Sequence, residues 1–103
     1  MDRVAQIKQF LKDNPSDSFL RHALALEYIK GGDDAAARQL FENLLSDEPT
    51  YIGSYYHLGK LLERNADQAA AIACYEKGME AARTAGDQHA LSELRAAWEE
   101  LAL

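Results

Sequence analysis

The chain contains few of the residues that cross-link, interrupt or anchor a protein. It has one cysteine, Cys74, and two prolines, Pro15 and Pro49, among 103 residues. A single cysteine cannot form an intrachain disulfide, which favours a reducing compartment. No apolar run approaches the length of a signal-peptide core or a membrane span. We therefore expect a cytoplasmic protein that has no membrane partner.

Basic residues are also scarce. Lys and Arg number 11 against 17 Asp and Glu, which gives a formal net charge of −6. A sequence-independent grip on phosphate backbones needs clustered Lys and Arg, and no basic stripe is present. The same charge disfavours adsorption to an anionic membrane surface. The composition therefore predicts no nucleic-acid partner.

The spacings that catalytic and metal sites require are missing as well. The three histidines, His22, His57 and His89, are scattered, and neither His-x3-His nor Cys-x2-Cys occurs. Cys74 lies within a helical pattern, which favours a packed thiol over a nucleophile paired with histidine. We predict no enzyme activity, no metal and no cofactor. An enzyme or metal protein built on Cys74 and the histidines is the alternative.

Helical periodicity covers nearly the whole sequence, and no period-two alternation is long enough to propose a strand. Both prolines lie between periodic segments, where they end helices. The connections are about two to five residues long, so neighbouring helices should pack antiparallel. The six predicted helices cover residues 2–13, 17–30, 34–46, 51–64, 68–85 and 88–102.

Short polar residues precede the predicted helices and are typical N-caps. Ser16 and Asp17 are candidates for the second helix, Asp33 for the third, Thr50 for the fourth and Asp67 for the fifth.

The sequence repeats with a period of 34 residues. A fixed period of this length is typical of arrays in which each helical hairpin buries its apolar face against the next. One period earlier, Ile7 and Pro15 fall on Phe41 and Pro49. The pairs that match after the shift include Leu24 with Leu58, Asp33 with Asp67, Ala37 with Ala71, and Phe41 with Tyr75.

The pattern within each period resembles the tetratricopeptide repeat. Arg21 and Arg83 depart from it, since the family often has a large aromatic at the first position and a proline at the second. The matching residues are Leu24, Ala25, Tyr28, Ala37, Phe41 and Pro49 in one unit, and Tyr55, Leu58, Gly59, Leu62, Ala71 and Tyr75 in the next.

The resemblance implies an all-α fold, a right-handed α-α superhelix of helical hairpins with about six helices. It also implies one domain over residues 1–103. Within it we expect a half repeat at 1–15, repeats at 18–51 and 52–85, and a C-terminal capping helix at 86–103.

In this family the first helix of each unit lines a concave groove, so the resemblance implies a binding groove here. Either this groove binds a peptide or protein segment, or a terminal helix covers its apolar end. Lys60 alone does not make the Lys and Asn clamp with which some members hold a C-terminal carboxylate. The expected groove residues are Phe19, His22, Leu26 and Ile29, followed by Tyr56, Lys60 and Glu63.

The predicted function is non-catalytic protein–protein interaction, in which an adaptor or scaffold binds a partner protein or peptide through the concave groove. The alternative is a small self-associating structural protein, such as a homodimer, that uses the same apolar stripe or the helix of Trp98. Trp98 itself is either a core plug against the fifth helix or an exposed contact for another chain.

Overall fold

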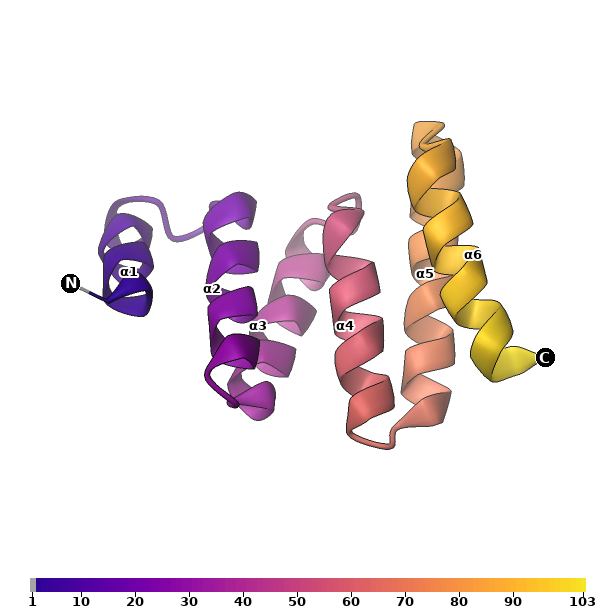
Figure 1. Ribbon diagram of the computed structural model, residues 1–103. Helices are drawn as coiled ribbons and strands as arrows, with labels where there is room; N and C mark the ends of the chain where they lie inside the picture. The colour runs from indigo at the N-terminus through magenta and orange to yellow at the C-terminus, as the bar shows by residue number, and fades with distance from the viewer. Residues whose placement is uncertain (1) are drawn as a thin grey trace. The chain divides into compact units, whose positions relative to one another are not determined.

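The computed structural model describes residues 2–103, which form six α-helices and no strand (Figure 1). The predicted helix boundaries differ from the observed ones by at most two residues, so the all-α prediction is confirmed. The helices are α1 (Arg3–Asp13), α2 (Ser18–Lys30), α3 (Asp34–Asp47), α4 (Gly53–Arg64), α5 (Gln68–Ala85) and α6 (Gln88–Ala102).

The helices belong to two compact units that meet in sequence between Glu48 and Pro49. In the first unit α2 packs against both α1 and α3. In the second unit α5 packs against both α4 and α6. Each unit is thus a three-helix arrangement in which the middle helix contacts both of its neighbours.

Aspartates cap five of the six helices. In each case the carboxylate accepts a hydrogen bond from the backbone N–H three residues further on, at 2.8 to 3.3 Å. This pairing satisfies one of the backbone donors that a helix start leaves without a partner. The capping residues are Asp2, Asp17, Asp33, Asp67 and Asp87.

The start of α4 is different, and the prediction that Thr50 caps it is wrong. Ile52 precedes α4 in helical conformation and makes no side-chain cap. The backbone N–H groups of Ser54 and Tyr55 instead donate to the carbonyls three residues earlier, each at 3.2 Å. Because this tight turn already supplies partners for the first donors, Thr50 lies too far upstream to act as a cap.

Two glycines bring α4 and α5 close together. A Cβ atom added to Gly59 would lie 2.2 Å from Cε1 of the Tyr75 ring. One added to Gly78 would lie 2.7 Å from Cβ of Tyr55. Real side chains do not tolerate such distances, so both positions require glycine at this helix spacing. The repeat pattern includes Gly59 but not Gly78.

The end of α5 matches the predicted helix boundary at residue 85. With Arg83 where the tetratricopeptide repeat often has a proline, α5 continues to Ala85, and Gly86 ends it at a φ of +71°. A left-handed residue after the last turn is the usual glycine C-cap.

The closing helix α6 packs on α5 through Leu91, Leu94 and Ala97, which are buried. Trp98 is only half-buried, and its indole N–H donates to the Glu76 carboxylate at 3.1 Å. Trp98 is therefore neither a fully buried plug nor a freely exposed ring.

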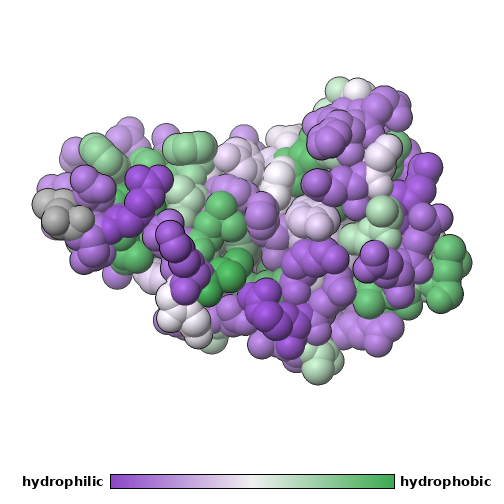
Figure 2. All heavy atoms as spheres, in the orientation of Figure 1, coloured by the Kyte–Doolittle hydropathy of each residue, from purple (hydrophilic) through white to green (hydrophobic). Residues whose placement is uncertain are grey.

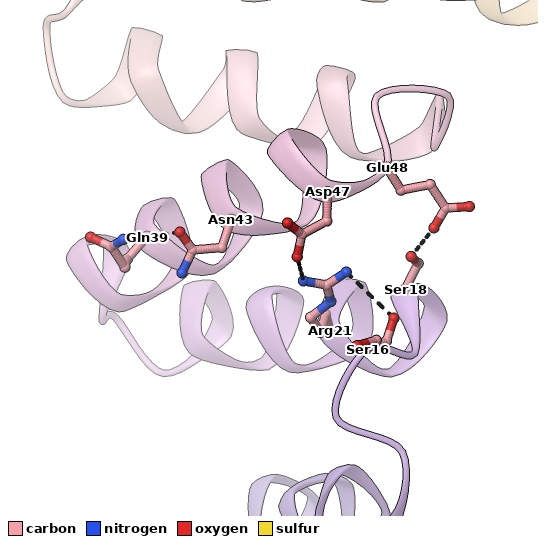
Figure 3. Close-up of polar contacts among 7 residues, drawn as sticks. All are labelled: Ser16, Ser18, Arg21, Gln39, Asn43, Asp47 and Glu48. Carbon is pink, nitrogen blue, oxygen red and sulfur yellow. Dashed lines mark hydrogen bonds and ion pairs between the residues drawn. The ribbon is translucent and has the colours of Figure 1, made fainter.

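Arg21 is buried although it carries a charge, and its partners come from the ends of neighbouring segments (Figure 3). Its guanidinium donates to Asp47 at 2.9 Å and to the Ser16 carbonyl at 3.4 Å. The Ser18 hydroxyl donates to the Glu48 carboxylate. Acidic residues at a helix C-terminus oppose the macrodipole, and these contacts from the start of α2 offset that cost for Asp47 and Glu48.

Candidate functional site

The residues expected to line the groove in the first unit all lie on α2. Phe19, Leu26 and Ile29 are spaced so that they share one face of the helix. Phe19 is 66% exposed, and the other two are half-buried. Figure 2 shows hydrophobic surface over α2 that is bordered by hydrophilic residues. This face therefore leaves apolar surface accessible, whereas Leu24 and Ala25 on the same helix are buried.

His22 lies on the same face of α2 and is held by an aromatic contact. Its ring centroid is 5.7 Å from that of Phe41, in an edge-to-face arrangement. Phe41 is fully buried, so it provides a fixed support for the imidazole. Edge-to-face pairs of this kind add a modest stabilisation beyond the area they bury.

The expected groove residues of the second unit lie on α4 and form a connected polar chain. The Lys60 ammonium is 5.6 Å from the centroid of the Tyr56 ring and 3.6 Å from the Glu63 carboxylate. Glu63 also accepts a hydrogen bond from the Tyr75 hydroxyl. Burial and the Glu63 carboxylate together raise the pKa of the Tyr75 hydroxyl. The positive charge of Lys60 is thus balanced within α4, which does not favour a clamp for a free carboxylate.

Cys74 and His57 occupy packed positions in the second unit. The Cys74 thiol is buried and donates to the Tyr55 carbonyl at 3.3 Å. Burial lowers the pKa of His57, and the nearby Glu93 carboxylate partly opposes this shift. The thiol is therefore packed as expected, and its geometry matches no exposed nucleophile.

Two other kinds of feature are not found among residues 2–103. No group of three or more His, Cys, Asp or Glu side chains lies close enough to hold a metal ion. None of the described helices combines the length and the apolar character that crossing a membrane requires.

A cleft between α5 and α6 was not predicted from the sequence, except that Trp98 was noted as a possible contact. Its volume is about 410 Å³, which falls within the usual range for binding pockets. The one signal for it in the sequence is Arg83, which replaces a helix-ending proline and lets α5 extend beside α6. The cleft is lined by Glu76, Met79, Arg83, Arg95, Trp98 and Glu99.

Comparison with known proteins identifies the family. The sequence model of one protein family, the tetratricopeptide repeat, matches residues 52–84. The crystal structure of a tetratricopeptide repeat domain protein from Salinibacter ruber is 46% identical, with a TM-score of 0.79. That match covers 82% of this chain and 96% of the other. The chain therefore belongs to the tetratricopeptide repeat family.

Two further relatives agree with this assignment. The solution structure of a protein from Bordetella parapertussis is 28% identical, with a TM-score of 0.84, and the match covers 99% of this chain and 89% of the other. A TPR repeat-containing protein from Pseudomonas aeruginosa is 27% identical over 91 residues, which are 88% of this chain and 87% of that protein. Proteins of this family are generally non-catalytic modules for protein–protein interaction, and this chain has their fold.

Proposed function

We propose that the chain is a non-catalytic adaptor that binds a segment of a partner protein through the concave groove of its repeats. The α2 face, formed by Phe19, His22, Leu26 and Ile29, supplies the apolar part of the site. The α4 face, formed by Tyr56, Lys60 and Glu63, supplies the polar part. The observation that supports this proposal is the accessible apolar surface on α2, beside fully buried core residues.

The chemistry of the two faces indicates what the partner segment presents. The α2 face favours apolar side chains, because Phe19, Leu26 and Ile29 offer aromatic and aliphatic surface. The α4 face favours neutral polar or aromatic groups, because Lys60 and Glu63 already satisfy each other. A partner segment that presents both apolar and neutral polar residues meets both requirements.

The energetics limit the affinity. Complete burial of Leu26 or Ile29 contributes at most about 1.5–3 kcal/mol each. Association costs roughly 4–15 kcal/mol in lost translational and rotational freedom. We therefore expect an isolated peptide to bind with a dissociation constant of about a micromolar or weaker.

Two finer proposals accompany this one: the protein is cytoplasmic, and residues 1–103 act as a single interaction domain with the repeat boundaries given above.

The test is affinity capture with a double variant on the α2 face. Leu26→Ser together with Ile29→Ser should abolish partner capture, because both substitutions remove apolar surface that the partner buries. The matched control is Gln39→Ser with Asn43→Ser on α3, whose side chains hydrogen-bond to each other at 3.3 Å (Figure 3). Circular dichroism should show native helicity in both variants. Undiminished capture by the folded α2 variant would exclude this face as the site.

A further inference from the structure

The helices α4 and α6 bury the same pattern of residues, although they lie 36 rather than 34 residues apart. Four residues of α4 each have a counterpart 36 residues later on α6, and all but one of these eight residues are buried. The exception is Trp98, which is half-buried where its counterpart Leu62 is fully packed. By this correspondence α6 is the first helix of a hairpin. The pairs are Tyr55 with Leu91, Leu58 with Leu94, Leu61 with Ala97, and Leu62 with Trp98.

The cleft marks the place where the second helix of that hairpin would pack. On α4, Gly59 lies against the Tyr75 ring and Glu63 accepts from its hydroxyl, so both residues hold α5. Their counterparts on α6, 36 residues later, are Arg95 and Glu99. Both line the α5–α6 cleft together with Trp98. The cleft is therefore the equivalent of the surface that α4 offers to α5.

Helix α1 presents the complementary situation. The period of 34 residues places its Phe10 on Leu44 of α3 and on Gly78 of α5. Both of these are buried, whereas Phe10 is 60% exposed. Gly78 is covered by Tyr55 of α4, the helix that precedes α5. The exposed face of α1 contains Arg3, Gln6, Phe10 and Asp13.

We propose that α1 of one copy docks in the α5–α6 cleft of a second copy and completes the hairpin there. The two surfaces offer one pair of opposite charges, Arg3 on the exposed face of α1 and Glu99 in the cleft. The contact joins different surfaces of identical chains, so it does not close on itself and builds short head-to-tail chains. This interaction is separate from the partner binding proposed above, which uses the faces of α2 and α4.

Specific contacts follow from the correspondence. Ile7 occupies the position on α1 that Tyr75 occupies on α5, and Glu99 occupies the position on α6 that Glu63 occupies on α4. Because Tyr75 reaches Glu63, the part of α1 around Ile7 should lie near Glu99. Arg3, one turn before Ile7, then comes within reach of Glu99. Phe10 packs beside Arg95, where a guanidinium can stack on its ring. Because Arg95 has a long side chain where α4 has Gly59, the incoming helix lies further from α6 than α5 lies from α4. We therefore expect weak, reversible association, with a dissociation constant of roughly 0.1 mM.

The first test measures molar mass and tryptophan emission of the full chain between about 0.02 and 1 mM. Trp98 is the only tryptophan, so its emission reports on the cleft alone. Mass should rise with concentration, and the emission should shift to the blue over the same range. Phe10→Ser should remove both changes. Phe19→Ser is the matched control, because Phe19 is equally exposed but lies on α2, and it should leave both unchanged.

Three results would overturn the proposal: a wild-type mass that stays monomeric up to about 1 mM, a rise in mass without the emission shift, or wild-type association by Phe10→Ser. Partner capture through α2 is measured separately from self-association. A failure of the self-association proposal therefore leaves the proposed partner binding unaffected, and the reverse also holds.

A charge exchange tests the direction of the contact. Arg3→Glu and Glu99→Arg should each weaken self-association by roughly tenfold, since each places like charges at the contact. An equimolar mixture should recover the wild-type affinity, because the carboxylate introduced at position 3 of one variant then meets the guanidinium introduced at position 99 of the other. A mixture no tighter than the separate variants would rule out the head-to-tail arrangement.

Discussion

At the scale of single residues, the turns before α3 and α5 place two different amino acids, glycine and alanine, in the same left-handed backbone conformation. Gly32 has a φ of +85° and Ala66 has a φ of +61°. Both come directly before the aspartate that caps the next helix. Glycine adopts this region without cost, whereas the Cβ of alanine clashes with the backbone there.

Replacing the alanine by glycine in one variant, and the glycine by alanine in another, should change the stability in opposite directions. Ala66→Gly should stabilise the protein by roughly 0.5–1 kcal/mol, because it relieves the left-handed strain. Gly32→Ala should destabilise it by about 1 kcal/mol for the same reason. Urea unfolding followed by circular dichroism measures both. Equal stability of the Ala66→Gly variant and the wild type would contradict a strained turn.

Arg21 and Asp47 form a pair whose value depends on both members being present. The Arg21 side chain is 10% exposed, and its Nε makes no hydrogen bond with any described residue. A buried charge with incomplete partners is costly, and the removal of its counter-ion is costlier still. The pair therefore joins α2 to α3 without a large net gain in stability.

A double-mutant cycle tests this account. Asp47→Ala alone should destabilise the protein by about 1–3 kcal/mol, since it leaves the guanidinium with only the Ser16 carbonyl. Adding Arg21→Met should restore most of the loss, because the apolar side chain fills the same space without a charge. Thermal or urea unfolding of the four proteins gives the coupling energy. Purely additive effects would show that the pair does not act as a unit.

Tyr75 should make the stability depend on pH in the alkaline range. Its pKa is raised in the folded protein by burial and by the Glu63 carboxylate, so the folded state keeps its proton where the unfolded state loses it. The contribution is complete below the unfolded pKa of about 10 and falls by about 1.4 kcal/mol per pH unit above it. Tyr75→Phe should lack this loss. Urea unfolding between about pH 8 and pH 11 compares the two, and parallel profiles would contradict the prediction.

Residue roles were predictable where one local interaction decides them. Asp33 and Asp67 cap helices as predicted, because a cap depends only on the residues that follow it. The prediction for Thr50 was wrong because a turn inserted before α4 moved the helix start. The partners of Arg21 could not be predicted, because Asp47 is 26 residues away and reaches it only through tertiary packing.

At the scale of helices, the α4–α5 hairpin depends on the small size of Gly59. The Tyr75 ring lies where a Cβ would be, and Tyr75 is fully buried, so the ring has little room to move. Helices that meet through such a position cannot separate without loss of the surrounding packing.

Gly59→Ala should therefore destabilise the protein by about 1–3 kcal/mol, despite the higher helix propensity of alanine. Gly53→Ala is the matched control on the same helix, since no atom lies within 4 Å of an added Cβ there. We expect that variant to be as stable as the wild type or slightly more so. The two melting temperatures decide the matter, and equal values would mean that α4 and α5 can move apart freely.

The helices themselves were predictable because their period, caps and prolines agree on the same boundaries. The cleft beside α6 was not, because α5 has 18 residues where α3 has 14, and α6 is shifted by two residues relative to the 34-residue period. A comparison at that fixed period aligns α6 in the wrong register. The side chains of the α2 and α4 faces lie on their expected helices, and their binding role stays a prediction.

At the scale of the whole molecule, the buried apolar residues are distributed unequally. Among residues 2–103, six lie in the first unit and twelve in the second. Helical-repeat proteins derive their stability from the units and from the contacts between neighbours, so such an imbalance should produce a gradient along the chain.

Native-state hydrogen exchange should reveal this gradient. Amides of α1 and α2 should exchange at least roughly tenfold faster than those of α4 and α5, because fewer buried contacts oppose their local opening. Two-dimensional NMR in deuterated buffer resolves the individual amides. Uniform protection across all helices would instead indicate that the chain opens only as a single cooperative unit.

The altered register of α6 has a practical consequence for anyone who wishes to lengthen this protein. A helix fused after Leu103 to complete the α6 hairpin would meet Arg95 where α4 offers Gly59 to α5, so it would not pack at the distance found between α4 and α5. Modular extension should instead begin directly after Ala85, with α6 replaced by a helix in the 34-residue period.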